Sequence, residues 1–103
     1  MTTSRSDGPM SITAIRVEGK PVNRGEFQYY MAPPQFKKHE IAGLTFICPC
    51  GCGGRGTLRF DTIYATGWSW DGNVDKPTVV PSVKQLDCGW HGYLRHGRWE
   101  TKK

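Results

Sequence analysis

Short hydrophobic runs separated by glycine and proline characterise the chain. The run at 12–18 (ITAIRVE) ends before Gly19-Lys20-Pro21, and the run at 27–31 (FQYYM) ends before Pro33-Pro34. β-branched and aromatic residues favour strands, and Gly and Pro interrupt them. The pattern therefore predicts strands over both runs.

Two β-hairpins are predicted further along the chain. The apolar residues 44–47 lead into a cysteine-rich, glycine-rich turn, and TLRF (57–60) follows it. HGYL (91–94) and RWE (98–100) flank a second turn at 95–97. Residues 35–43 are polar and basic, which indicates a loop or a single helical turn, and residues 76–83 hold two prolines, which suits an extended edge segment. We find no amphipathic helix of useful length, so the predicted fold class is mostly β, with short antiparallel strands and hairpins and little helix.

The length of 103 residues indicates one domain. We expect residues 1–10 to be a disordered polar leader and residues 11–103 to form a single zinc-stabilised β domain. Only 37% of the residues are hydrophobic, and Gly and Pro together number 20 (13 and 7), so the core is small and a cross-link or metal is expected to support it. No run approaches the roughly 20 apolar residues of a membrane span. The N-terminal residues show no secretory signal, which predicts a reducing, cytoplasmic location.

The four cysteines are arranged as metal ligands rather than as disulfides. Cys48, Cys50 and Cys52 lie within five residues, and a disulfide between residues two apart fits its preferred geometry poorly. Cys88 and His91 form a second pair with C-x₂-H spacing. Zinc (Zn2+) prefers four thiolate or imidazole ligands in a tetrahedron. The sequence therefore predicts one closed, structural zinc site.

These five candidate donors exceed the four positions of a tetrahedral site. One arrangement uses Cys88 and His91 with two cysteines of the first group, for which Cys48 and Cys52 are preferred because C-x-C spacing is tight. The alternative is a four-cysteine site with His91 outside it. A redox role for Cys50-Gly51-Cys52 is a further alternative.

Aromatic and basic residues gather in the second half of the chain. They can be core packing for a small domain. They can also form a binding surface, because aromatic and basic side chains dominate binding hot spots. The candidate partner-binding residues are Trp68, Trp70, Lys84, Trp90, Arg95 and Arg98. The net charge of +5 permits nucleic acid as a partner.

Three ordered motifs carry a resemblance to a known family. They are FICPCGCG, then WSWDGN-x₂-KPT-x₂-PSV, then C-x₂-H-x-YLR-x-GRW. Over about residues 44–100 the chain resembles a family of small phage and prophage proteins catalogued as domain of unknown function 6527. The resemblance implies a zinc-binding β domain and a cytoplasmic setting in the host cell. It also suggests a protein-binding role, since some relatives resemble neighbours of ubiquitin-like conjugation operons.

The function predicted from these observations is a non-enzymatic binding module. We expect a phage accessory or anti-defence protein, for example an inhibitor of a defence nuclease, whose partner is a host protein. This expectation rests on a closed metal site and on the apparent lack of a nucleophile–base pair. The alternatives are a nucleic-acid-binding zinc module and a zinc-dependent hydrolase.

Overall fold

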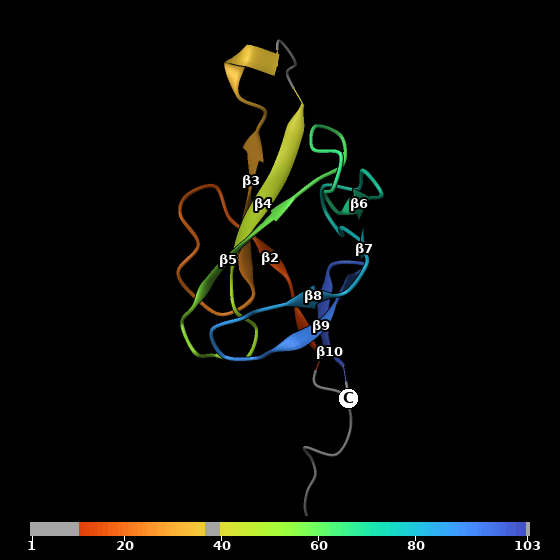
Figure 1. Ribbon diagram of the computed structural model, residues 1–103. Coiled ribbons are helices and arrows are strands. Elements are labelled where there is room, and N and C mark those ends of the chain that lie inside the picture. Colours follow the sequence, from red (N-terminus) through yellow and green to blue (C-terminus); the bar gives the residue numbers. More distant parts are fainter. Residues whose placement is uncertain (1–10, 37–39, 103) are drawn as a thin grey trace, which may run out of the picture.

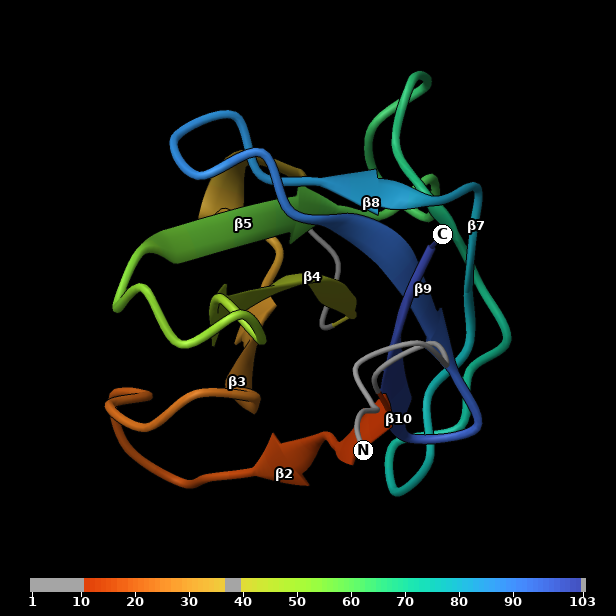
Figure 2. The same ribbon diagram turned by 90° about the horizontal axis from the view of Figure 1, so that it is seen from below.

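The computed structural model describes residues 11–36 and 40–102, so the predicted leader at 1–10 lies outside the described residues. The described chain is built around two four-stranded sheets that face each other, as Figure 2 shows. The described residues include no helix long and apolar enough to cross a membrane. The predicted mostly-β class of short strands is confirmed.

Sheet A has the strand order β1-β10-β9-β8 and is antiparallel throughout. Its strands are β1 (Ser11–Thr13), β8 (Val83–Lys84), β9 (His91–Arg95) and β10 (Arg98–Thr101). Strands β9 and β10 form the closing hairpin that the sequence predicts, with Trp99 opposite Leu94. His96 and Gly97 turn the chain there with φ angles of 49° and 73°.

Sheet B has the strand order β2-β3-β4-β5 (Figure 1). Its strands are β2 (Ile15–Arg16), β3 (Glu26–Met31), β4 (Ile41–Ile47) and β5 (Arg55–Arg59). Strands β3, β4 and β5 are antiparallel, whereas β2 pairs with β3 in parallel. A third, two-stranded sheet joins β6 (Ser69–Trp70) to β7 (Val79–Val80).

The predicted strand over 12–18 is divided in the structure. Strand β1 ends at Thr13 in sheet A, and β2 begins at Ile15 in sheet B. Ala14 between them is buried, and its N–H donates to the carbonyl of Gly97. One β-branched run therefore serves both sheets.

The predicted loop at 35–43 includes the end of a 3₁₀ turn at Pro34–Phe36 and the start of β4. Residues 37–39 lie outside the described part of the chain.

Aromatic side chains join the two sheets. The rings of Phe46 in sheet B and Trp99 in sheet A lie 4.7 Å apart between centroids, and the Trp90 ring meets Trp99 edge-on at 6.0 Å. The indole N–H of Trp99 donates to the carbonyl of Gly25 at 3.0 Å, which satisfies its one polar atom inside the core. The fully buried side chains of this core include Phe27, Phe46, Phe60, Leu44, Leu94 and Trp99. Packing of this kind fixes the position of β9 relative to the cysteine-bearing loop after β4.

Candidate functional site

The loop that joins β4 to β5 carries three of the four cysteines. Cys48 follows β4 directly and is buried, whereas Cys50 and Cys52 are exposed. Gly51 and Gly53 have φ angles of 93° and 82°, which glycine adopts at little cost, and they let the loop turn within a few residues. The loop is thus the tip of the predicted β-hairpin.

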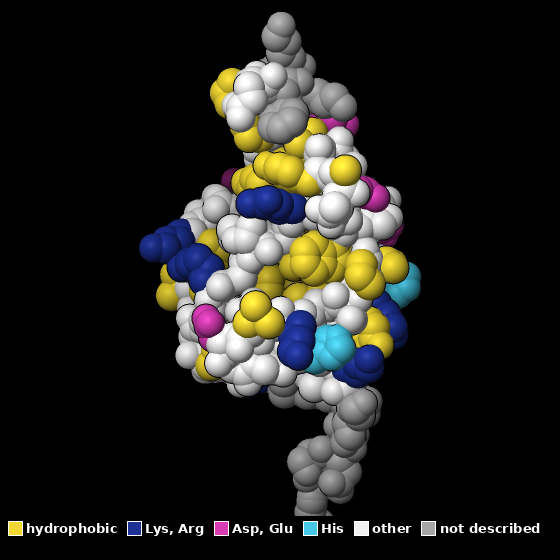
Figure 3. All heavy atoms as spheres, viewed as in Figure 1, with side chains coloured by type: hydrophobic (Ala, Val, Ile, Leu, Met, Phe, Trp, Pro, Cys, Tyr) yellow, Lys and Arg dark blue, Asp and Glu magenta, His cyan; other side chains and the backbone are white. Residues whose placement is uncertain are grey.

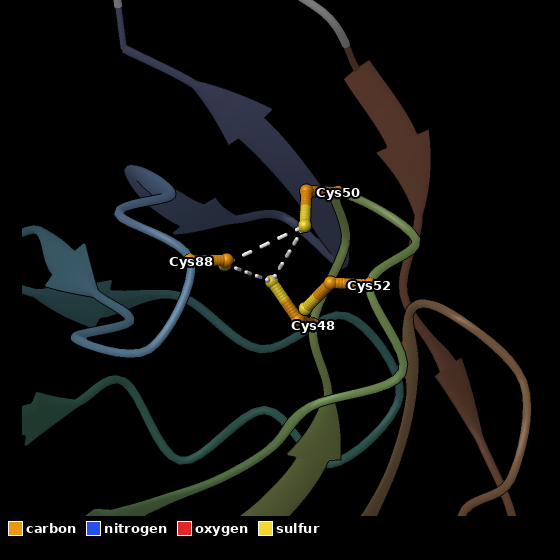
Figure 4. Close-up of side chains that lie close together, drawn as sticks. All are labelled: Cys48, Cys50, Cys52 and Cys88. Carbon is orange, nitrogen blue, oxygen red and sulfur yellow. Dashed lines mark hydrogen bonds between the residues drawn. The ribbon is translucent and has the colours of Figure 1, made fainter.

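The fourth cysteine reaches this loop from sheet A. Cys88 lies in the turn between β8 and β9, and its Sγ atom is 3.5 Å from those of both Cys48 and Cys50. Cys48 Sγ and Cys50 Sγ are 3.3 Å apart, and all four sulfur atoms lie within 4.8 Å of one another. Figure 4 shows Cys88 approaching from the other side of the cluster.

This geometry suits a tetrahedral metal ion. With metal–sulfur bonds of about 2.3 Å, neighbouring sulfur atoms of a tetrahedron are roughly 3.8 Å apart. All four cysteines are free, so their sulfur atoms are available as ligands. The structure therefore brings together a four-cysteine cluster that could bind a metal ion.

The ionisation of the cysteines differs across the cluster. Burial raises the pKa of the Cys48 thiol well above its usual range, and burial also raises the pKa of Cys50. The pKa of Cys88 is lowered to about 7, first because the backbone N–H of Trp90 hydrogen-bonds its thiolate. A bound cation would favour the thiolate form of every ligand, because it supplies the opposite charge.

His91 lies apart from this cluster, against a serine hydroxyl. The His91 Nε2 atom is 2.8 Å from Ser82 Oγ, and both side chains are half-buried. The arrangement of the cysteines corresponds to the four-cysteine alternative from the sequence. Trp90 explains why: it points into the core, so the next side chain on the strand, that of His91, points to the opposite face.

The pairing of β8 with β9 places Ser82 beside His91. Val83 lies opposite Gly92, and both are buried. Because side chains alternate along strands, Ser82, Lys84 and His91 belong to the outer face of sheet A. Lys84 is directly opposite His91, so Ser82 is its diagonal neighbour, which is within reach of an imidazole ring.

Hydrogen bonds to their backbone carbonyls hold both members of this pair. The indole N–H of Trp68 donates to the Ser82 carbonyl at 3.2 Å. The N–H of Lys102 donates to the His91 carbonyl at 2.8 Å. In the turn between them, the N–H of Gly89 donates to the carbonyl of Gln85. Ser82 and His91 are thus presented by strand ends rather than by a long loop.

This pair has the chemistry of a nucleophile and its base. A neutral imidazole whose Nε2 accepts the serine O–H can take that proton when the oxygen attacks a carbonyl carbon. Within the described residues, no carboxylate hydrogen-bonds the His91 ring, so the arrangement is a dyad.

Comparison with protein families gives a match over most of the chain. The family model described as bacterial ubiquitination-like system serine protease (BubE) matches residues 18–102. The chain belongs to this family. No curated protein and no solved structure gave a match.

The BubE description overturns the predicted function. The expectation of a non-enzymatic phage or anti-defence binding module is wrong, since the family is named as a serine protease and therefore as an enzyme. The two alternatives, a nucleic-acid-binding module and a zinc-dependent hydrolase, do not describe a serine protease either. His91 was predicted to be a metal ligand, whereas its imidazole contacts the hydroxyl of Ser82.

The candidate partner-binding residues divide into two groups. Trp90 is 6% exposed and belongs to the core, so it offers no binding surface, and Trp68 and Trp70 pack against that core from its edge. The exposed members are Lys84, Arg95 and Arg98. Partner binding by these residues stays a prediction.

Ser82 was not among the predicted site residues, although it stands in the KPT-x₂-PSV motif.

Proposed function

We propose that the chain is a serine protease in which Ser82 is the nucleophile and His91 the general base. The observation that carries the proposal is the 2.8 Å contact between Ser82 Oγ and His91 Nε2. Membership of the BubE family, which is described as a serine protease, supports the same reaction class. The substrate is then a polypeptide, and the family description favours a protein of a bacterial ubiquitination-like system.

The dyad accounts for both halves of the reaction. Ser82 Oγ attacks the scissile carbonyl carbon while His91 Nε2 takes the hydroxyl proton. The imidazolium then gives that proton to the leaving amine, which breaks the C–N bond and leaves an acyl ester on Ser82. After the amine leaves, His91 takes a proton from a water molecule, whose oxygen attacks the ester carbonyl carbon. The imidazolium then protonates Ser82 Oγ as the C–Oγ bond breaks, which releases the carboxylic acid product and restores the hydroxyl.

The four cysteines hold, in this proposal, one zinc ion with a structural role. Four thiolates close a tetrahedral site, and zinc is the metal that such sites most often contain. The cluster joins the loop after β4 to the turn that leads into His91, so the zinc supports the dyad by fixing the β8–β9 turn. Metal analysis of protein purified without added metal should give about one equivalent of zinc, and protein with all four cysteines changed to serine should give none. A metal-free wild-type protein that melts at the same temperature as the metal-containing protein would contradict the structural role.

Labelling with a fluorophosphonate probe tests the dyad without knowledge of the substrate. The probe forms a covalent bond to an activated serine oxygen and loses fluoride. We expect a single adduct, located by mass spectrometry on the peptide that contains Ser82, and no adduct in Ser82→Ala. His91→Ala should slow labelling by about 10²–10⁴-fold, the usual contribution of a general base.

Ser69→Ala is the matched control. Ser69 is an exposed serine in β6, opposite Val80, and the hydrogen bond of the His91 ring goes to Ser82 instead. Its substitution should leave the labelling rate unchanged, and thermal melting should be similar in all three variants. Labelling that persists in Ser82→Ala, or a wild-type rate in a folded His91→Ala variant, would refute the assignment.

A further inference from the structure

A cavity of about 420 Å³ opens directly beside Ser82. One wall is formed by residues 78–82, and the other by Tyr93, Arg95 and His96 at the end of β9. In Figure 3, hydrophobic side chains lie next to basic and histidine side chains in the region where Figure 1 shows β7, β8 and β9. Because Ser82 itself lines the cavity, a substrate group bound there lies next to the scissile bond.

Arg95 lies along β9 at a distance from Ser82 that the strand register determines. Ser82 precedes Val83, which pairs with Gly92, so continuing the antiparallel register places Ser82 opposite Tyr93. Arg95 is two residues further along the same face of β9, an advance of roughly 7 Å. An extended substrate advances by the same amount per two residues, so Arg95 can meet a side chain within two residues of the scissile bond.

The guanidinium of Arg95 is held in place but only partly paired. It lies 3.9 Å from the centroid of the Tyr93 ring, which supports its flat face. Its Nη1 atom donates to Glu100 Oε1 at 3.3 Å, and 49% of its side chain is exposed. Among the described residues no acceptor takes a hydrogen bond from its Nε or Nη2 atoms. These N–H groups match the two oxygens of a carboxylate.

The rest of the cavity is suited to the aliphatic stem of an acidic side chain. Val79, Val80 and Pro81 line the wall opposite Tyr93. The N–H of His96 donates to Thr78 Oγ1 at 2.8 Å, which joins the two walls at the end that lies beside Arg95. The cavity therefore combines an apolar wall with one cation near its end, and a basic substrate side chain would meet like charge there.

We propose that this cavity selects substrates with an acidic residue within two positions of the scissile bond, and that Arg95 is the residue that binds its carboxylate. The inference rests on the proposed protease activity of Ser82 and extends it to the substrate. Binding places the acidic side chain between Tyr93 and the β7 wall, and the guanidinium donates two hydrogen bonds to the carboxylate in addition to the one it gives Glu100.

A library of short random peptides, analysed by mass spectrometry, tests this preference. We expect cleavage sites with Glu or Asp enriched at one of the four positions nearest to the scissile bond. A matched pair of peptides with Glu or Gln at that position should differ by about 10-fold to 100-fold in kcat/KM, as expected for a charge-assisted hydrogen bond. Arg95→Gln should remove this difference, mainly through KM on the Glu peptide, while cleavage of the Gln peptide changes little.

Arg98→Gln is the control for charge alone. Arg98 lies opposite Arg95 on β10, but its Nε donates to Ser11 Oγ at 2.9 Å, away from the cavity. This variant has the same net charge as Arg95→Gln and should keep the Glu preference. Equal rates for the wild-type protein on the Glu and Gln peptides, or equal losses in the two variants, would overturn the inference while leaving the protease intact.

Fluorophosphonate labelling distinguishes a failure of the proposed substrate preference from a failure of the proposed protease function. If Ser82 is labelled but no library peptide is cleaved, the cavity does not recognise residues near the scissile bond, and the inference is wrong. If Ser82 is not labelled, the proposed protease function itself fails. Arg95→Glu adds a positive test, since it should favour a peptide with Lys at the selected position.

Discussion

Cys88→Ser tests whether the cysteine cluster links the two parts of the fold. Cys88 is exposed, so its change to serine removes no core packing. It is also the one member of the cluster that comes from the β8–β9 turn, since the other three lie within a single loop. With Cys88 gone, the remaining cysteines can no longer connect that turn to sheet B through a metal.

The size of the effect follows from the chain that the metal closes. Residues 52–88 form a loop of 37 residues. Closing a loop of this length with a cross-link lowers the entropy of the unfolded chain and contributes about 4 kcal/mol to the free energy of unfolding. For a domain of about 100 residues, each kcal/mol corresponds to about 4–8 °C in melting temperature. We therefore expect Cys88→Ser to melt roughly 15–30 °C below the wild-type protein.

The assay is thermal unfolding by circular dichroism, combined with metal analysis of the same samples. Leu86→Ser is the matched control, because Leu86 lies in the same turn and is 85% exposed. Such a surface change should alter stability by less than about 0.5 kcal/mol. Cys52→Ser should cost less than Cys88→Ser, since Cys48 and Cys50 still connect the loop to Cys88. A fall of less than about 4 °C for Cys88→Ser, with the metal retained, would refute a bridging role.

Further predictions concern the core and two titrating side chains. Trp99→Ala should cost about 3–5 kcal/mol, measured by chemical denaturation, because Trp99 is 1% exposed and lies between the two sheets. Glu26 accepts hydrogen bonds from the N–H groups of Asn23 and Val22, which lower its pKa below the usual value of 4.5. The stability that this carboxylate contributes is therefore present above that pH and lost on acidification, so Glu26→Gln should flatten the acid side of a curve of unfolding free energy against pH. Burial raises the pKa of Tyr29 to about 12 and also raises the pKa of Tyr30, so ultraviolet titration should show a late-ionising component that Tyr29→Phe reduces. The stability that Tyr29 contributes is lost as pH rises from about 10 to 12.

Local sequence patterns predicted the hairpins and the cysteine cluster. The strand at 27–31, the β4–β5 hairpin and the β9–β10 hairpin follow from runs of apolar residues bounded by Gly-rich or Pro-rich turns. The four cysteines also converge, in the arrangement that was the alternative to the preferred site with three cysteines and His91, because three occupy one turn and the fourth stands next to a predicted strand. These features depend on neighbours in the sequence or on one strong chemical preference.

The contact between Ser82 and His91 could not be predicted from spacing alone. C-x₂-H spacing predicts a shared metal when both residues lie in one turn. Here Cys88 lies in the turn, whereas His91 already belongs to a strand with Trp90 pointing the other way. The contact with Ser82 depends on the register of β8 against β9, which packing of the sheet determines.

The pairing of β1 with β10 determines when sheet A can form during synthesis of the chain. Sheet A, which contains His91 and which Ser82 enters just before β8, joins the earliest described strand to the latest one, with Ser11 opposite Glu100. Contacts between such distant residues form only after both have been synthesised, and they form slowly compared with local hairpins. A growing chain that ends before β10 therefore lacks half of the support around β9, so we expect the nascent protein to be inactive. If Ser82 and His91 form the proposed dyad, its activity would begin only once the strand at Arg98–Thr101 has been synthesised.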